Sequence, residues 1–141
     1  LGGHDVVVDV HGQEDLCRVG MRLDLCEFER QGRRRHVVHV ELERKATIEA
    51  VLDALRTFQS RPYALGCPSA TDPTIIYRPE PDRPQPYYDR DAGRGMAVTV
   101  GRLRPCEVLD YKMVVLSHNT IRGAAGGSIL NAELMIAEGL L

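Results

Sequence analysis

The sequence lacks an excess of charge of either sign. Its 141 residues carry 18 Lys and Arg side chains against 20 Asp and Glu side chains, which leaves a formal net charge of -2. A balance of this kind creates no field that recruits nucleic acid or an anionic membrane. The arginine run at residues 33–35 is interpreted as a solvated turn, because a nucleic-acid surface needs more basic residues and aromatic rings. We therefore expect neither a nucleic-acid partner nor a membrane partner.

Long apolar runs are also missing. No stretch approaches the roughly 20 apolar residues that cross a bilayer. The first residues lack the charged and apolar regions of a secretory signal. These absences predict a soluble, cytoplasmic protein. The chain does not begin with Met, and residues 6–10 already resemble an apolar strand, so we expect residue 1 to be a cut and not a natural start.

The cysteines and histidines form no metal-binding pattern. The four cysteines are widely spaced and include no C-x-x-C pair: Cys17, Cys26, Cys67 and Cys106. Neither a zinc site nor a disulfide framework is expected from them. His36 and His39 have an H-x-x-H spacing, but they lie in an alternating, strand-like run. An odd separation on a strand sends the two side chains to opposite faces, so no metal site is predicted.

The order of apolar patterns predicts one α+β domain. With 43% apolar residues, the chain is long enough for one domain with a core. Two helices are expected, from Thr47 to about residue 60 and from about residue 120 to Gly139. Residues 11–35 are expected to be irregular, and the proline-rich residues 78–86 to form an extended connection. Strands are expected at residues 6–10, 36–43, 74–77, 96–103 and 111–117. This order favours a mixed, mostly antiparallel sheet.

Two polar segments are candidates for function. Residues 123–128, Gly-Ala-Ala-Gly-Gly-Ser, stand where a strand passes into a helix but match no phosphate-binding glycine pattern. They are interpreted as close packing against another surface, because glycine inside a helix costs about 1 kcal/mol relative to alanine. Residues 89–95 combine alternate charges with glycines and are interpreted as a charged surface turn that contributes little stability.

Asn119 lies between the last predicted strand and the last predicted helix. One interpretation is a helix cap, in which the side chain accepts a backbone N–H. The other is a contact with a second amide, such as the carboxamide of a nicotinamide, because each amide offers a donor and an acceptor. The spacing alone favours the cap.

Three motifs resemble one enzyme family. They are Leu65-Gly66-Cys67-Pro68-Ser69-Ala70, the stretch 83–102 that begins Arg83-Pro84-Gln85-Pro86, and the stretch 117–133 that begins Ser117-His118-Asn119-Thr120-Ile121-Arg122-Gly123. Together they resemble the C-terminal catalytic and dimerisation domain of the archaeal and fungal aspartate-semialdehyde dehydrogenases. The resemblance is strong from about residue 36 to residue 141 and faint before it.

The resemblance implies a fold, a reaction and partners. The fold is like the C-terminal domain of glyceraldehyde-3-phosphate dehydrogenase, with helices on one face of the sheet and a dimer interface formed by the sheet. The reaction is the NADPH-dependent reduction of aspartyl phosphate to aspartate semialdehyde, on the route to threonine, methionine and lysine. Asn119 and Thr120 are implied to contact NADP, which the missing N-terminal domain mostly binds. The expected partners are a second copy in a homodimer or tetramer, that domain and a small-molecule substrate.

Two positions depart from the family pattern. The family carries an arginine that grips the substrate carboxylate and, seven positions later, a histidine that acts as general acid and base. Arg18 matches the arginine, but Leu25 lies seven positions beyond it, and counting back from residues 40–42 puts Arg34 at the histidine position. His36 is the nearest substitute. A second departure is Tyr87, which stands where the family usually has arginine.

Two hypotheses follow from the resemblance. None of the four cysteines matches the nucleophile of the family, so the first hypothesis is an incomplete part of the enzyme that is inactive alone. The alternative is a non-catalytic dimerisation or interaction module derived from the same family.

Overall fold

A computed structural model describes the backbone of residues 4–9, 18–23, 26–30 and 33–141, and the side chains from residue 36 onward. Within these ranges the helices and strands follow one another in this order: β1 (His4–Asp9), β2 (Arg18–Leu23), β3 (Cys26–Arg30), β4 (Arg33–Val40), α1 (Ile48–Thr57), α2 (Arg61–Ala64), β5 (Ile75–Arg78), α3 (Pro86–Asp89), η1 (Ala92–Gly95), β6 (Val98–Pro105), β7 (Tyr111–Leu116), η2 (Ile121–Ala125) and α4 (Gly126–Ala137).

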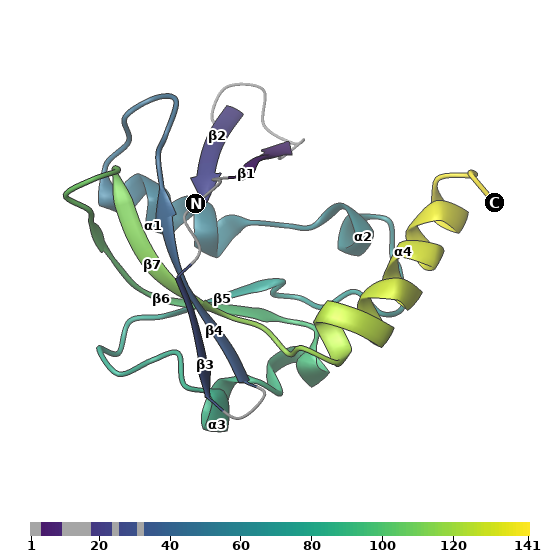
Figure 1. Cartoon of the computed structure of the whole chain (residues 1–141). Helices are drawn as coiled ribbons and strands as arrows, with labels where there is room; N and C mark the ends of the chain where they lie inside the picture. The colour runs from purple at the N-terminus through teal and green to yellow at the C-terminus, as the bar shows by residue number, and fades with distance from the viewer. Residues whose placement is uncertain (1–3, 10–17, 24–25, 31–32) are drawn as a thin grey trace.

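A five-stranded sheet organises the chain (Figure 1). Its strand order is β3-β4-β7-β6-β5, and all neighbours are antiparallel except β5 and β6, which are parallel. β1 and β2 form a separate antiparallel pair. The predicted α+β class and the mixed, mostly antiparallel sheet are confirmed.

The expectation that residues 11–35 are irregular is wrong for the part of that stretch that the structure describes. β2 and β3 lie inside it, and β4 begins at Arg33. β2 alternates Val19, Met21 and Leu23 with polar or small residues, which is the period of a strand. β3 pairs with β4, and Arg30 lies opposite Arg33. The charged residues within these segments obscure the short alternation in the sequence.

The helix α1 covers one face of the sheet. Thr47 begins it as predicted, because its hydroxyl accepts the N–H of Ala50 at 3.3 Å. The apolar face of α1 then packs on a buried cluster from three strands. The cluster is Val38, Val40, Val100, Leu103 and Met113, and the residues packed on it from α1 are Ile48, Val51, Leu52 and Leu55.

The opposite face of the sheet is crossed by the proline-rich segment. Thr99 and Gly101 alternate with the core residue Val100, so they point away from α1. A Cβ built on Gly101 would lie 2.6 Å from the carbonyl oxygen of Arg83 and 3.0 Å from Cδ of Pro84. Pro84 is itself buried, and Thr99 is 0% exposed. Gly101 is therefore the position at which the backbone of this segment lies directly on the sheet.

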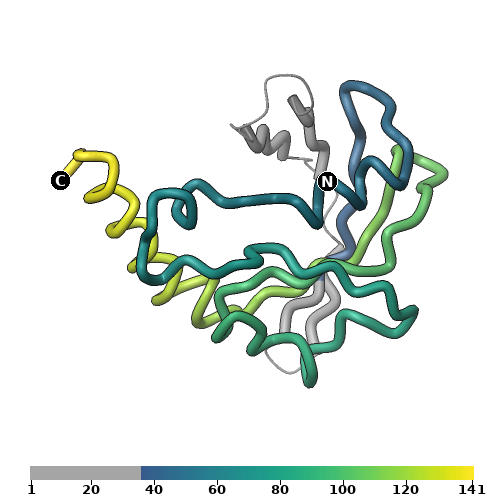
Figure 2. The backbone as a smooth tube through the Cα atoms, turned by 180° about the vertical axis from the view of Figure 1, so that it is seen from behind, coloured from purple at the N-terminus to yellow at the C-terminus, as the bar shows by residue number. Residues whose placement is uncertain are grey.

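The chain ends in a helix that projects from the sheet, as both views show (Figures 1 and 2). Its base forms a second core of Cys67, Met96 and Leu130, against which Ile121 and Leu134 pack. A Cβ on Gly126 would lie 2.6 Å from Sδ of Met96, so one of the small residues does serve close packing, within the chain itself. No helix in the described ranges is long and apolar enough to cross a membrane.

Candidate functional site

Residues 117–120 connect β7 to η2 and carry the predicted cofactor contact. Both Asn119 and Thr120 are exposed. The imidazole of His118 fixes the turn, because its Nδ1 accepts the N–H of Ile121 at 3.2 Å and lies 3.3 Å from Oγ1 of Thr120. Its Nε2 lies 3.7 Å from a carboxylate oxygen of Asp91. His118, which sequence reasoning did not single out, thus connects this turn to the segment around Asp91.

The interpretation of Asn119 as a helix cap is wrong. The helical turn η2 begins after Thr120 and has no side-chain capping hydrogen bond from that residue. His118, three residues before Ile121, supplies the acceptor that a cap would offer. Asn119 is exposed, and among the residues that the structure describes none forms a hydrogen bond with its side chain. A histidine three residues before the first helical position was the signal in the sequence.

His36 lies on β4 opposite Val115 of β7. Because β4 runs antiparallel to β7, His36 and the turn that holds Asn119 belong to the same end of the sheet. The alternation of β4 turns the His36 ring toward the α1 face, together with Val38. Its Nδ1 is buried and has no hydrogen-bond partner among the described residues.

The arginine that the resemblance assigns to the substrate lies on a strand outside the five-stranded sheet. Arg18 is the first residue of β2, which pairs with β1 and not with a strand of the large sheet. Its side chain and Leu25 lie outside the described residues. Arg34 lies opposite Glu29 in the β3–β4 pair. The roles of Arg18 and His36 stay predictions.

Asp89 is a buried carboxylate that the sequence interpretation placed on the surface. It is 1% exposed. Its oxygens accept two hydrogen bonds from Arg83, from Nε at 2.7 Å and from a terminal nitrogen at 2.5 Å. They also accept hydrogen bonds from Nε of Arg78 at 3.2 Å and from the backbone N–H of Gln85 at 2.7 Å. Burial alone would raise the pKa of Asp89, but the hydrogen bonds from Arg83 and Gln85 and the two guanidinium charges hold it below its usual value. The expectation of a surface turn is therefore wrong at Asp89.

This carboxylate positions the segment that lies next to the turn of residues 117–120. Asp89 fixes Arg83, whose carbonyl lies against Gly101, and it ends α3 two residues before Asp91. Asp91 in turn lies near His118. The buried ion pairs of Asp89 thus fix the segment that ends at Asp91, next to the turn that carries Asn119.

The sequence match decides the family. Residues 35–122 match the sequence model described as "Semialdehyde dehydrogenase, dimerisation domain". This chain belongs to that family. The matched range contains the buried Asp89 and the exposed Asn119 and Thr120, whereas Arg18 precedes it.

Several relatives of this dimerisation domain are known. An aspartate-semialdehyde dehydrogenase of Archaeoglobus fulgidus is 51% identical over 104 residues, which are 74% of this chain and 29% of the relative. A malonyl CoA reductase (NADP) of Metallosphaera sedula is 37% identical over 107 residues, which are 74% of this chain and 30% of the relative. The chain thus spans under a third of the length of these relatives.

The fold of this dimerisation domain is that of a solved relative. The crystal structure of aspartate semialdehyde dehydrogenase with NADP from Candida albicans superposes with a TM-score of 0.70 and 42% identity. The superposition covers 77% of this chain and 31% of that structure.

Proposed function

We propose that this chain is the dimerisation and nicotinamide-contacting part of an aspartate-semialdehyde dehydrogenase, which reduces aspartyl phosphate to aspartate semialdehyde with NADPH. The observation that carries the proposal is the family match over residues 35–122, with an exposed Asn119 at the end of β7. The Archaeoglobus fulgidus relative, an aspartate-semialdehyde dehydrogenase, supports the proposal. The Candida albicans structure, which is of the same enzyme with NADP, supports it as well.

The amide of Asn119 suits one end of the cofactor. A carboxamide and a side-chain amide pair through two hydrogen bonds, because each supplies an N–H donor and a carbonyl acceptor. Thr120 adds a hydroxyl beside it. The exposed turn accommodates the nicotinamide end of NADP, whereas the sequence contains no G-x-G-x-x-G turn for its pyrophosphate. We propose that a nucleotide-binding domain holds the rest of the cofactor.

On the substrate side the proposal assigns Arg18 to the carboxylate of the substrate, since a guanidinium binds a carboxylate through two parallel hydrogen bonds. His36 is the candidate proton donor, at the same end of the sheet as Asn119. A proton donor must come within about 3 Å of the reacting group. As the proton donor, His36 should be needed for turnover, so removal of its imidazole should lower kcat.

Self-association is the second part of the proposal. The family is described as a dimerisation domain, and we propose a homodimer, or a tetramer built from dimers, through the sheet. Exposed apolar side chains on the projecting helix α4 and on the last residues after it offer a further surface, which we propose contacts the nucleotide-binding domain. They are Ile129, Met135, Ile136, Leu140 and Leu141.

A second candidate is a non-catalytic dimerisation module. It is favoured by the missing histidine seven positions after Arg18, where Leu25 stands. A module of this kind would keep the sheet and the buried Asp89 and would have no use for an exposed Asn119. The two candidates therefore differ in whether Asn119 affects catalysis.

A chimera tests both candidates. The chain replaces the matching segment of the Archaeoglobus fulgidus relative, and phosphate-dependent formation of NADPH from aspartate semialdehyde is measured. The enzyme proposal expects activity, with the KM for NADP raised about tenfold in Asn119→Ala, since one or two hydrogen bonds are worth about 1 kcal/mol each. The matched control is Asn131→Ala, at an exposed position of α4, which should leave KM unchanged.

The outcomes separate the candidates. A folded, dimeric chimera without activity would favour the non-catalytic module. An active chimera whose KM for NADP does not respond to Asn119→Ala would refute the nicotinamide contact. Activity of the isolated chain would overturn the statement that it is inactive alone.

A further inference from the structure

The turn between β6 and β7 holds a thiol beside an imidazole. Cys106 directly follows β6, and its Sγ lies 3.3 Å from Nδ1 of His39 on β4. The N–H of Cys106 closes the turn by donating to the carbonyl of Asp110 at 3.1 Å, and the N–H of Asp110 joins the turn to β4 by donating to the carbonyl of Val40 at 3.0 Å. The thiol is partly exposed. Two strands and a closed turn thus hold the sulfur and the ring together at the surface.

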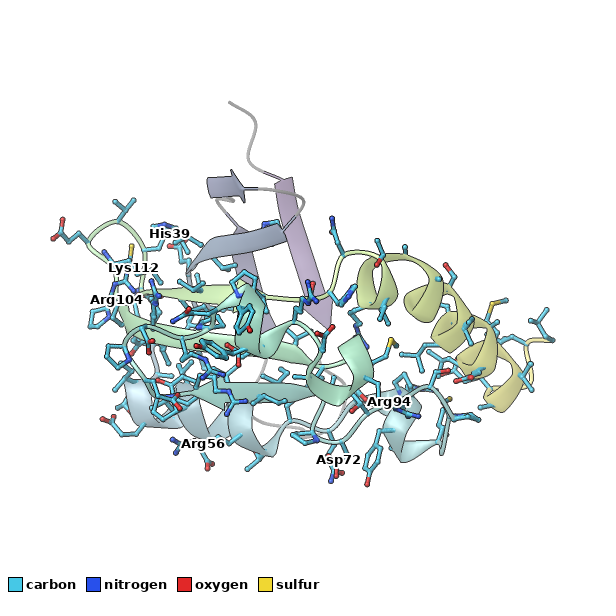
Figure 3. The ribbon with its side chains drawn as sticks, turned by 90° about the horizontal axis from the view of Figure 1, so that it is seen from below. His39, Arg56, Asp72, Arg94, Arg104 and Lys112 are labelled. Carbon is cyan, nitrogen blue, oxygen red and sulfur yellow. The ribbon has the colours of Figure 1, made fainter. Side chains whose placement is uncertain are left out.

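A row of basic side chains crosses the sheet next to this thiol. His39 is the register partner of Lys112, and Lys112 is the register partner of Arg104. Register partners project from the same face of a sheet, and the like charges of Lys112 and Arg104, which lie opposite one another, are unfavourable. Figure 3 shows the three side chains together at one end of the sheet. An anion at this row would relieve the repulsion.

Two acidic side chains, Asp110 and Glu107, belong to this turn. The carboxylate of Asp110 is engaged by the ammonium of Lys45 and by the N–H of Leu42 at 2.7 Å. Glu107 is exposed on the turn, next to the thiol in the chain. Within the described part of the chain, no ion pair joins Lys112 or Arg104 to a carboxylate. Arg104 donates only to the carbonyl of Arg102, at 2.9 Å.

The surroundings of Cys106 favour its thiolate. The backbone N–H groups of Leu109 and Val108, together with the His39 ring, lower the pKa of the Cys106 thiol from 9.0 to about 7. The thiolate is therefore the main form above about pH 7 and is protonated as the pH falls below it. The thiolate is the form that attacks electrophiles.

We propose that Cys106, with His39, Lys112 and Arg104, is a site of thiol–disulfide exchange that takes disulfides carrying negative charge. The Cys106 thiolate attacks one sulfur of the incoming disulfide, a new sulfur–sulfur bond forms, the old one breaks, and the other half leaves as a thiolate that takes a proton from water. The incoming disulfide is the oxidant, and Cys106 is oxidised. The basic row attracts the anionic disulfide, as opposite charge raises the rate of encounter.

Cys67 is the internal comparison. It is 7% exposed and packs with Met96 and Leu130 at the base of α4. No hydrogen bond in the described part of the chain joins its sulfur to an imidazole. A thiol buried in this way is inert toward a charged disulfide. Selective reaction at Cys106 over Cys67 is therefore the first expectation.

Rate alone does not separate this site from an ordinary exposed thiol. At pH 7 a thiol with a pKa of about 7 is about half ionised, against about 3% for one of ~8.5. A thiolate of lower pKa is also less nucleophilic, with a Brønsted coefficient of about 0.4–0.5, which removes most of that gain. The decisive quantities are the pH midpoint of the reaction and its dependence on the charge of the disulfide.

The test uses the full chain, in whatever association it makes, with three disulfides of similar size. These are 3,3′-dithiodipropionate, which is anionic, hydroxyethyl disulfide, which is neutral, and cystamine, which is cationic. Mass spectrometry of the peptides gives the rate at each cysteine. We expect Cys106 to react about tenfold faster with the anionic than with the cationic disulfide at low salt, with the ratio falling as salt screens the row. The pH midpoint should lie near 7.

Two pairs of variants make the test specific. Lys112→Gln with Arg104→Gln should abolish the charge preference at Cys106, whereas Arg56→Gln with Arg94→Gln removes as many charges elsewhere (Figure 3) and should preserve it. His39→Asn should raise the pH midpoint only part of the way to the value of a free thiol, because the backbone N–H groups of Leu109 and Val108 remain. Equal rates for the three disulfides, reaction at Cys67 as fast as at Cys106, or a midpoint unchanged by His39→Asn would each overturn the proposal.

Discussion

Replacing Asp89 by alanine should strongly destabilise the domain. The carboxylate is 0% exposed and is bound by Arg83 and Arg78, whose side chains are 20% and 33% exposed. Its removal leaves two guanidinium groups and the N–H of Gln85 without their acceptor. Breaking a buried ion pair from one side costs about 3–5 kcal/mol. Because both arginines reach solvent, we expect the lower end, about 3 kcal/mol.

Urea unfolding followed by circular dichroism measures this loss. With a slope of about 1–3 kcal/mol per molar urea, about 3 kcal/mol lowers the midpoint by at least about 1 M at an unchanged slope. Asp89→Asn keeps the shape of the side chain and one acceptor oxygen and should lose less. Asp82→Ala is the control, because its exposed carboxylate accepts only the side chain of Gln85 and should change stability by less than about 1 kcal/mol. An Asp89→Ala protein within 1 kcal/mol of the original would refute the anchoring role.

Three further changes test the fold by the same unfolding measurement. Gly101→Ala should destabilise the domain by about 1–3 kcal/mol, because the added Cβ meets backbone atoms. The control is Gly66→Ala, at a residue with φ +72 and no neighbour within 4 Å, which should cost only about 1 kcal/mol. Equal losses at the two positions would contradict the close approach of the proline-rich segment to Gly101. Thr47→Ala should lose about 1 kcal/mol of capping, and no loss would contradict it. Because the pKa values of Asp89 and Asp110 lie below 3.8 in the folded protein, their stabilisation is present above about pH 4 and is lost as the pH falls through those values. Asp89→Asn should flatten this acid loss, and an unchanged profile would contradict the assignment.

The parts of the fold that were predicted correctly have local causes. α1 has a capping threonine and an apolar period that fits a helix, and β7 has an apolar run that fits a buried strand. β2 and β3 were missed, because each is a short alternation among charged residues. The pairing that makes them strands is a contact between segments, and charge composition does not report it.

The surroundings of the site were less predictable. The burial of Asp89 depends on Arg78, eleven residues earlier, and on Gly101, which lets the proline-rich segment lie on the sheet. Neither contact leaves a mark in the spacing of residues 89–95. The role of His118 was readable, since a histidine three residues before Ile121 can replace a cap. The cofactor role of Asn119 came from the family resemblance and not from the spacing, which favoured the cap.

Sedimentation equilibrium of the purified chain tests the assignment to a dimerisation domain most directly. The account predicts a species of twice the chain mass of 15.7 kDa at micromolar concentrations. A single species of 15.7 kDa over the same range, from a chain whose circular dichroism shows it folded, would contradict it.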